Sequence, residues 1–147
     1  TNDAPSSVSR LIDMGVEPFL VTASVNLILA QRLCRKICQD CKSEDPVSDS
    51  ILNDVQVKKE DIGKFKPYKG MGCKTCSNTG YKGRIAVYEV MPFTEGLKDA
   101  VINGATTSEL KHQAIHEGMQ TLRMSAVNKL KEGMTTIEEV TRTTAPD

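Results

Sequence analysis

Cys38-Gln39-Asp40-Cys41 and Cys73-Lys74-Thr75-Cys76 are the two stretches around which the chain is organised. Each has the C-x2-C spacing that lets one tight turn aim two sulfurs at a single ion, and 31 residues separate the pairs. Structural zinc sites use four such ligands in a tetrahedron that holds no water and contributes folding free energy. The glycines after the second pair, Gly80 and Gly83, permit turns that point backbone N–H groups toward sulfur. The sequence therefore predicts a structural zinc site formed by Cys38, Cys41, Cys73 and Cys76.

Disulfide bonding is the first alternative for these cysteines. The chain has five cysteines, which is an odd number. It has no signal-peptide pattern and no apolar run long enough to span a bilayer. An oxidising compartment is therefore unsupported, and reduced thiols are the better expectation.

An iron–sulfur cluster is the second alternative, because Cys34-x3-Cys38-x2-Cys41 has the spacing with which radical-SAM enzymes hold a [4Fe–4S] cluster. That interpretation leaves Cys73 and Cys76 without a role and needs a barrel much longer than this chain. Cys34 follows an apolar run, so we expect it to be a small buried hydrophobe.

The charge balance gives little support to a nucleic-acid or membrane partner. Nineteen basic residues match nineteen acidic ones, so no net field favours a polyanion or an anionic membrane. Residues 58–84 are locally basic, which usually marks a solvated face and otherwise marks contact with an acidic partner or phosphate. The basic residues of this run are Lys58, Lys59, Lys64, Lys66, Lys69, Lys74, Lys82 and Arg84.

Before the second cysteine pair, the pattern predicts mainly helix. A short helix is expected over residues 6–14, and Pro18 starts a second one. Apolar residues wrap nearly the whole circumference over residues 19–33, which indicates burial on several sides. We call residues 42–72 the insert. It is polar, with weak helical signals over 51–55 and 59–64 and little core of its own, so metal at its base would remove loop entropy from the unfolded chain.

After the second pair, residues 84–91 form the clearest strand, which Pro92 ends. Four helices are expected beyond it, with Gly104, Gly118 and Gly133 as stops. Capping-box patterns join Thr106 to Glu109 and Thr135 to Glu138. The tail from Thr141 should fray. The predicted fold class is mostly α with a small β component.

No catalytic constellation is evident. His112 and His116 have the i, i+4 spacing of zincins, but Glu117 lies outside the pair and no third ligand follows, so two surface histidines are expected. The chain has no G-x-x-x-x-G-K-[ST] phosphate loop and no nucleophile arrangement. By itself it should catalyse nothing.

Several collinear stretches resemble the C-terminal part of secretion ATPases, and more narrowly type IV pilus assembly (extension) ATPases, PilB-like, with the type II secretion ATPases, GspE-like, as sisters. The likeness covers essentially the whole chain. The stretches that carry it are Thr1-Asn2-Asp3-Ala4, Ser9-Arg10-Leu11-Ile12-Asp13-Met14-Gly15-Val16-Glu17-Pro18-Phe19, Gln31-Arg32-Leu33, the two cysteine pairs, Gly80-Tyr81-Lys82-Gly83-Arg84 and Tyr88-Glu89.

This resemblance implies the C-terminal portion of a RecA-like P-loop ATPase domain with a tetracysteine zinc subdomain and a C-terminal helical bundle. It implies a division into 1–37 as a remnant of the ATPase core, 38–83 as the zinc subdomain and 84–147 as a strand with a helical subdomain. The implied parent is a homohexamer that binds ATP and Mg²⁺ and drives pilin assembly through an inner-membrane platform protein. It is cytoplasmic and peripheral at the bacterial inner membrane, with no nucleic-acid partner and no direct membrane insertion.

The resemblance also implies that this chain begins after the parent's catalytic motifs, because Thr1-Asn2 resembles the residues directly after a histidine-bearing box. Arg84 matches an arginine that in relatives lies near the base or ribose of the bound nucleotide, where a guanidinium can stack on adenine. The alternative for Arg84 is an ion pair with a local carboxylate. Cys34 stands where relatives usually carry an aliphatic residue. The alternative for the whole chain is a free-standing zinc ribbon that binds nucleic acid through the basic run from Lys58 to Arg84.

Overall fold

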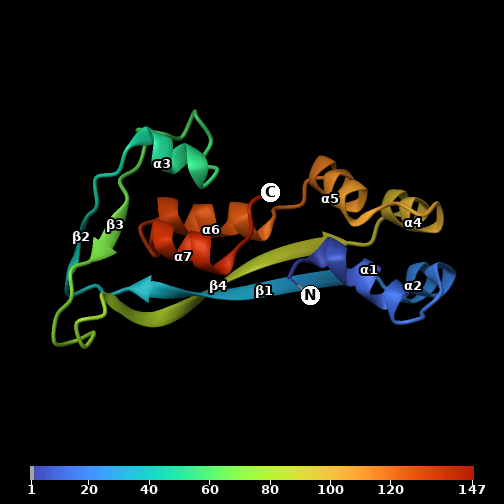
Figure 1. The fold of residues 1–147 in the computed structure, drawn as a ribbon, viewed down its shortest axis with the longest axis horizontal. Helices are drawn as coiled ribbons and strands as arrows, with labels where there is room; N and C mark the ends of the chain where they lie inside the picture. The colour runs from blue at the N-terminus through green and yellow to red at the C-terminus, as the bar shows by residue number, and fades with distance from the viewer. Residues whose placement is uncertain (1) are drawn as a thin grey trace. The chain divides into compact units, whose positions relative to one another are not determined.

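Two long strands form the main sheet of the chain. The computed structural model describes residues 2–147 and leaves Thr1, part of the quoted opening stretch, outside the described residues. Strand β1 (Leu27–Ile37) pairs with β4 (Tyr81–Pro92) in a two-stranded sheet (Figure 1). Contacts divide the chain into unit 1, residues 1–31 and 88–121, and unit 2, residues 32–87 and 122–147.

Unit 1 is built from four helices around one apolar core. They are α1 (Ala4–Asp13), α2 (Pro18–Ser24), α4 (Glu95–Ile102) and α5 (Thr107–His116). Asp3 begins α1 by accepting the N–H of Ser6 at 2.8 Å, and Pro5 occupies the first turn, where its missing N–H costs nothing. The buried carboxylate of Glu89 accepts the N–H of Ala4 at 2.7 Å. The core consists of Ala4, Val8, Val21, Met91, Phe93, Leu97, Val101, Leu110, Ala114 and Met119.

Unit 2 carries the cysteines, a short strand pair and three helices. Strands β2 (Lys42–Glu44) and β3 (Tyr68–Gly70) are antiparallel, with Ser43 opposite Lys69. The helices are α3 (Asp49–Asp54), α6 (Leu122–Lys131) and α7 (Ile137–Thr143). Its buried apolar residues are Cys34, Ile37, Leu52, Val55, Val57, Val87, Ala126, Val127, Leu130 and Val140.

The helix predicted through residues 19–33 is wrong beyond Ser24. Helix α2 ends there and β1 begins at Leu27. Burial on several sides is also wrong, because Phe19 and Leu29 are 68% and 50% exposed. An apolar run without periodicity does not distinguish a buried helix from a helix followed by a strand with apolar side chains on both faces.

The insert has more structure than the sequence indicates. The β2–β3 pair was not predicted, residues 59–64 form turns and not a helix, and Leu52, Val55 and Val57 are buried. Helix α3 confirms the helical signal near residue 51. With helices over about 40% of the chain and strands over about 20%, the fold is a small α/β arrangement, and the β component is larger than predicted.

The four helices expected after Pro92 are confirmed as α4 to α7, and Gly104 and Gly118 follow α4 and α5 with positive φ angles. Thr106 accepts the N–H of Glu109 at 3.2 Å as predicted. The second cap is shifted by one residue, to Thr136. The tail was expected to fray from Thr141, but α7 continues to Thr143.

Candidate metal centre

The four paired cysteines come together in unit 2. Cys38 follows β1, Cys41 precedes β2, and Cys73 and Cys76 lie in the turns between β3 and β4. Their Sγ atoms all lie within 4.8 Å of one another. The Sγ–Sγ distances are 3.7 Å for Cys38–Cys73, 3.8 Å for Cys41–Cys76 and 3.7 Å for Cys73–Cys76.

These distances fit a tetrahedral ion. A Zn–S bond of about 2.3 Å places the corners of a regular tetrahedron about 3.8 Å apart. A disulfide would need sulfurs about 2.05 Å apart, and all five cysteines are free thiols, which contradicts the disulfide alternative. Four thiolates could therefore hold one zinc ion in a closed site.

Backbone N–H groups support the sulfurs, as expected for Gly80, whereas the bond expected near Gly83 is not seen among the described residues. Gly72 donates to Cys41 Sγ at 3.3 Å, Cys73 to Cys76 Sγ at 3.3 Å and Gly80 to Cys76 Sγ at 3.2 Å. Such bonds stabilise thiolates and orient them toward a metal.

Gly70 and Gly80 make the turns possible through close backbone contact. A Cβ on Gly70 would lie 2.0 Å from the carbonyl oxygen of Gly80, and a Cβ on Gly80 would lie 2.5 Å from that of Gly70. Gly80 also has φ +80°, a conformation that side chains rarely adopt. Only glycine fits either position without displacing the other strand.

Without a metal ion, the pKa values of Cys76 and Cys41 shift in opposite directions. Burial raises the pKa of Cys76, but the N–H groups of Cys73 and Gly80 and the neighbouring thiols outweigh it and lower the pKa to about 6. Burial and the thiols of Cys76, Cys38 and Cys73 raise the pKa of Cys41 to about 11. Within the cluster Cys76 therefore loses its proton before Cys41.

Cys34 does not belong to the cluster. It is fully buried, its Sγ lies 3.2 Å from Thr143 Oγ1 on α7, and burial raises its pKa. Its burial confirms the prediction that Cys34 is a small buried hydrophobe. The partners of Cys38 and Cys41 in the cluster are Cys73 and Cys76, and not Cys34. The iron–sulfur interpretation therefore has no geometric support.

Arg84, His112 and His116 are not part of the four-cysteine cluster. Arg84 is exposed on β4, and within residues 2–147 it has no ion pair, so a local carboxylate partner is not seen. Its contact with nucleotide stays a prediction. His112 and His116 are exposed on α5, as expected.

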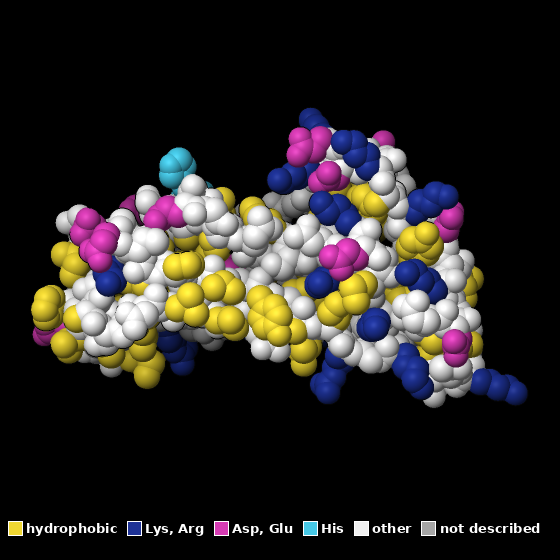
Figure 2. Space-filling model, turned by 180° about the vertical axis from the view of Figure 1, so that it is seen from behind, with side chains coloured by type: hydrophobic (Ala, Val, Ile, Leu, Met, Phe, Trp, Pro, Cys, Tyr) yellow, Lys and Arg dark blue, Asp and Glu magenta, His cyan; other side chains and the backbone are white. Residues whose placement is uncertain are grey.

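The basic run is partly neutralised by the insert itself. Lys66 pairs with Glu44 at 3.1 Å and Lys69 with Asp45 at 3.5 Å. Figure 2 shows Lys and Arg side chains projecting from the surface next to acidic ones. This is the pattern of a solvated face.

An ion cluster that sequence reasoning missed lies near Cys34. Glu139 on α7 is fully buried, and its Oε1 accepts from Arg35 Nε and Nη2 at 3.0 and 2.8 Å. Arg142 donates to both oxygens, at 2.9 and 2.8 Å. Burial opposes ionisation, but the two guanidiniums lower the pKa of Glu139 to about 2. Since 104 residues separate Arg35 from Glu139, no local pattern announces this contact.

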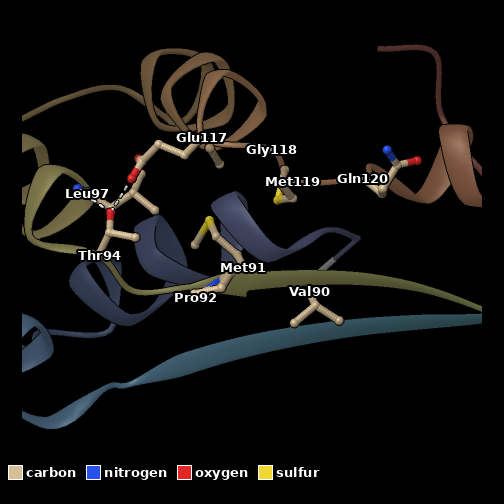
Figure 3. A pocket seen from close by; sticks show the side chains of 10 residues that line it. Val90, Met91, Pro92, Thr94, Leu97, Glu117, Gly118, Met119 and Gln120 are labelled. Atoms are coloured by element: carbon tan, nitrogen blue, oxygen red, sulfur yellow. Dashed lines mark hydrogen bonds between the residues drawn. The ribbon is translucent and has the colours of Figure 1, made fainter.

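An apolar pocket of about 350 Å³ lies in unit 1, where β4 ends (Figure 3). Val90, Met91 and Leu97 contribute apolar walls. Glu117 at its edge accepts the hydroxyl of Thr94 at 2.6 Å. None of the predicted site residues lines it.

The sequence profile of the family described as "Type II/IV secretion system protein" matches residues 1–142. The chain therefore belongs to this family, and the resemblance noted in the sequence is confirmed. Within the described residues, no helix is long and apolar enough to cross a membrane.

Two relatives named "Type IV pilus assembly ATPase PilB" are similar over almost the whole chain. The protein of Myxococcus xanthus is 56% identical over all of this chain and 26% of its own length. That of Pseudomonas aeruginosa is 42% identical over 98% of this chain and 25% of its own length. A "Type II secretion system protein E" of Aeromonas hydrophila is 32% identical over all of this chain. The chain thus spans about a quarter of the length of these pilus relatives.

Proposed function

We propose that this chain is the zinc-binding C-terminal region of a hexameric ATPase that powers type IV pilus assembly. The observation that carries the proposal is the group of four sulfurs at tetrahedral spacing in a chain that matches the secretion family over residues 1–142. The pilus relatives, at 56% and 42% identity, favour the pilus motor over its type II secretion sister.

The zinc in this proposal is structural. Cys38, Cys41, Cys73 and Cys76 would fill all four positions of the ion, which leaves none for water or substrate. When bound, the ion supplies a crosslink between the two ends of the insert. The chain's own contribution is to hold the sulfurs with N–H groups, as Gly72 and Gly80 do.

Nucleotide hydrolysis would belong to the rest of the parent. This chain has no phosphate-binding loop, so it is inactive alone, and residues 1–37 are the remnant of a RecA-like core. Arg84, which is exposed and has no ion pair among residues 2–147, would be an outer contact of the parent's nucleotide. ATP and Mg²⁺ therefore enter only in the full-length protein.

The parent's partners follow from the same proposal. They are the other subunits of the homohexamer and an inner-membrane platform protein of the pilus machinery. The parent works on the cytoplasmic side and inserts no segment of this region into the bilayer. Nucleic acid is not among the expected partners, because Lys66 and Lys69 of the basic run already pair with carboxylates.

Elemental analysis of the reduced, folded chain tests the zinc site. We expect one zinc per chain, less than about 0.2 in Cys38→Ser and Cys73→Ser, and an unchanged ratio in Cys34→Ser, the matched control. No ATP turnover is expected from the chain alone. A metal-free folded chain, or robust hydrolysis, would contradict the proposal.

A further inference from the structure

The net charge of zero is the sum of opposite formal charges on the two units. Unit 1 has eight acidic and three basic side chains, a formal charge of −5. Unit 2 has eleven acidic and sixteen basic side chains, a formal charge of +5. The sequence showed a basic run over residues 58–84 but not this division, which depends on the segments that share a unit.

The positive excess of unit 2 has a definite location. Residues 42–72 and residues 122–147 are each balanced, so the excess comes from residues 32–41 and 73–87. Four thiolates with one zinc ion subtract two charges, which leaves +3. Three lysines there have no ion pair within residues 2–147, and we call them the basic end: Lys36, Lys74 and Lys82.

An exposed apolar side chain lies beside these lysines. Met71 is 66% exposed, although its backbone N–H is fixed to Cys41 O at 3.1 Å. Lys82 Nζ reaches the carbonyl of Thr75 at 3.3 Å, and the contact between Gly70 and Gly80 brings the two segments together. Met71 is therefore an exposed apolar side chain on the segment that leads into Cys73 and Lys74.

Unit 1 has the complementary arrangement. A hollow of about 210 Å³ is lined by apolar side chains of α1, α4 and α5, including Val8, Val101 and Leu110, and by Asp13. Asp99 and Glu109 lie within two positions of lining residues, and Glu17 precedes the lining residue Pro18. All four acids are exposed and have no ion pair within residues 2–147, and we call this site the acidic hollow: Asp13, Glu17, Asp99 and Glu109.

We propose that the acidic hollow of one copy of this chain docks on the basic end of a second copy, with Met71 entering the hollow. Opposite charges steer such an encounter and set its orientation, while a desolvated apolar side chain supplies affinity. The contact joins different surfaces of the two copies, so it is head-to-tail, and repeated contacts of this kind form a ring when the rotation between copies closes. The inference rests on the proposed hexamer and names one of its subunit contacts. It makes no claim about a role of zinc in the motor.

Charge reversal in two separate variants tests the contact. The first variant is Asp13→Lys, Glu17→Lys, Asp99→Lys and Glu109→Lys, which takes unit 1 from −5 to +3. The second is Lys36→Glu, Lys74→Glu and Lys82→Glu, which takes zinc-loaded unit 2 from +3 to −3. Arg84 is left unchanged so that its predicted nucleotide contact is not involved. Circular dichroism and zinc content confirm that each variant is folded and loaded.

Sedimentation velocity measures the outcome over a range of concentrations. We expect the wild type to self-associate at about 50 mM NaCl and to do so at least tenfold more weakly at about 500 mM. Each variant alone should be monomeric, and an equimolar mixture should associate, because every head then meets a tail of opposite charge. Met71→Ser should weaken wild-type association, whereas Ile51→Ser, at a 43% exposed position on α3, should not.

Three results would overturn the docking proposal. They are a monomeric wild type at every salt and concentration, a mixture of variants that fails to associate, and a monomeric wild type that binds a labelled DNA duplex through the three lysines. The last result would make nucleic acid the partner of the basic end. Zinc content is measured on the same samples, so loss of docking with one zinc per chain leaves the proposed function standing.

Discussion

Arg35 and Glu139 form an ion pair in which Nε and Nη2 of Arg35 both donate to Oε1, at 3.0 and 2.8 Å, and the Glu139 side chain is fully buried whereas that of Arg35 is 42% exposed. The backbone N–H of Arg35 adds a bond to Oε2 at 2.6 Å. The Arg35 guanidinium also lies over the ring of Tyr81, 4.1 Å from its centroid. Arg35 thus connects three segments: β1, on which it lies, α7 through Glu139, and the start of β4 through Tyr81.

Glu139→Gln should destabilise the folded chain by about 2–3 kcal/mol. This loss of folding free energy is at or below the range usual for breaking a buried ion pair. The reason is that Arg35 and Arg142 are half exposed and can be solvated by water once Glu139 is neutral. Urea unfolding measures the change. Glu138→Gln, on the exposed neighbour, is the matched control and should change stability by less than about 0.5 kcal/mol. Equal effects of the two substitutions would contradict a special role for Glu139.

The same pair makes stability depend on acidity. The folded pKa of Glu139, about 2, lies below the ordinary value of 4.5, so its contribution is full above pH 4.5 and disappears as pH falls toward 2. The stability difference between wild type and Glu139→Gln should therefore shrink over that window. Unfolding in urea at several pH values between about 6 and 2.5 tests this, and a constant difference would contradict it.

Gly80→Ala should be far more damaging than Gly83→Ala. Both glycines have positive φ, but a Cβ at Gly80 would strike the backbone of Gly70, whereas nothing lies within 4 Å of one at Gly83. We expect a loss of about 1 kcal/mol at Gly83 from backbone strain alone and more than about 2 kcal/mol at Gly80. Zinc affinity should fall only at Gly80, because relief of the Cβ clash displaces the backbone N–H that bonds to Cys76 Sγ. Competition with a chromophoric chelator measures that affinity, and equal losses would refute the close approach.

Thr144→Val should destabilise the folded chain, because Thr144 is a hydrogen-bond partner of the buried Arg123. Arg123 is 3% exposed and donates to Thr144 Oγ1 at 2.7 Å and to its carbonyl at 2.8 Å. Removal of the hydroxyl leaves a buried charged donor short of a partner, which costs about 1–2 kcal/mol. Thr141→Val, at an exposed position, is the control for thermal unfolding.

Cys34 should resist alkylation under conditions that modify the other cysteines. It is fully buried and burial raises its pKa, so little thiolate is available. With zinc bound we expect no rapid labelling by iodoacetamide, and after chelation we expect labelling first at Cys41 and Cys73, which are partly exposed. Peptide mass spectrometry resolves the sites. Labelling of Cys34 as fast as Cys41 would show that it is accessible.

The sequence anticipated the features that local rules control. The spacing within each cysteine pair is set by one turn, so Cys38 with Cys41 and Cys73 with Cys76 could be identified before the fold was known. Gly104 and Gly118 could likewise be identified as helix stops, because a positive φ after a helix needs no distant partner. The run over residues 19–33 failed because neither its length nor its pattern distinguished one long helix from α2 followed by β1.

The sequence by itself determined the two cysteine pairs, the helix cap at Thr106 and the family. Each of these depends on residues a few positions apart or on a collinear match along the chain. Only the tertiary structure decided that Arg35 and Arg142 enclose Glu139, that Gly70 lies against Gly80, and that opposite charges gather in separate units. The first two are contacts between residues remote in sequence, and burial gives them their strength, because a low-dielectric, close-packed environment exists only after the chain has folded. The third depends on the segments that the fold brings into the same unit.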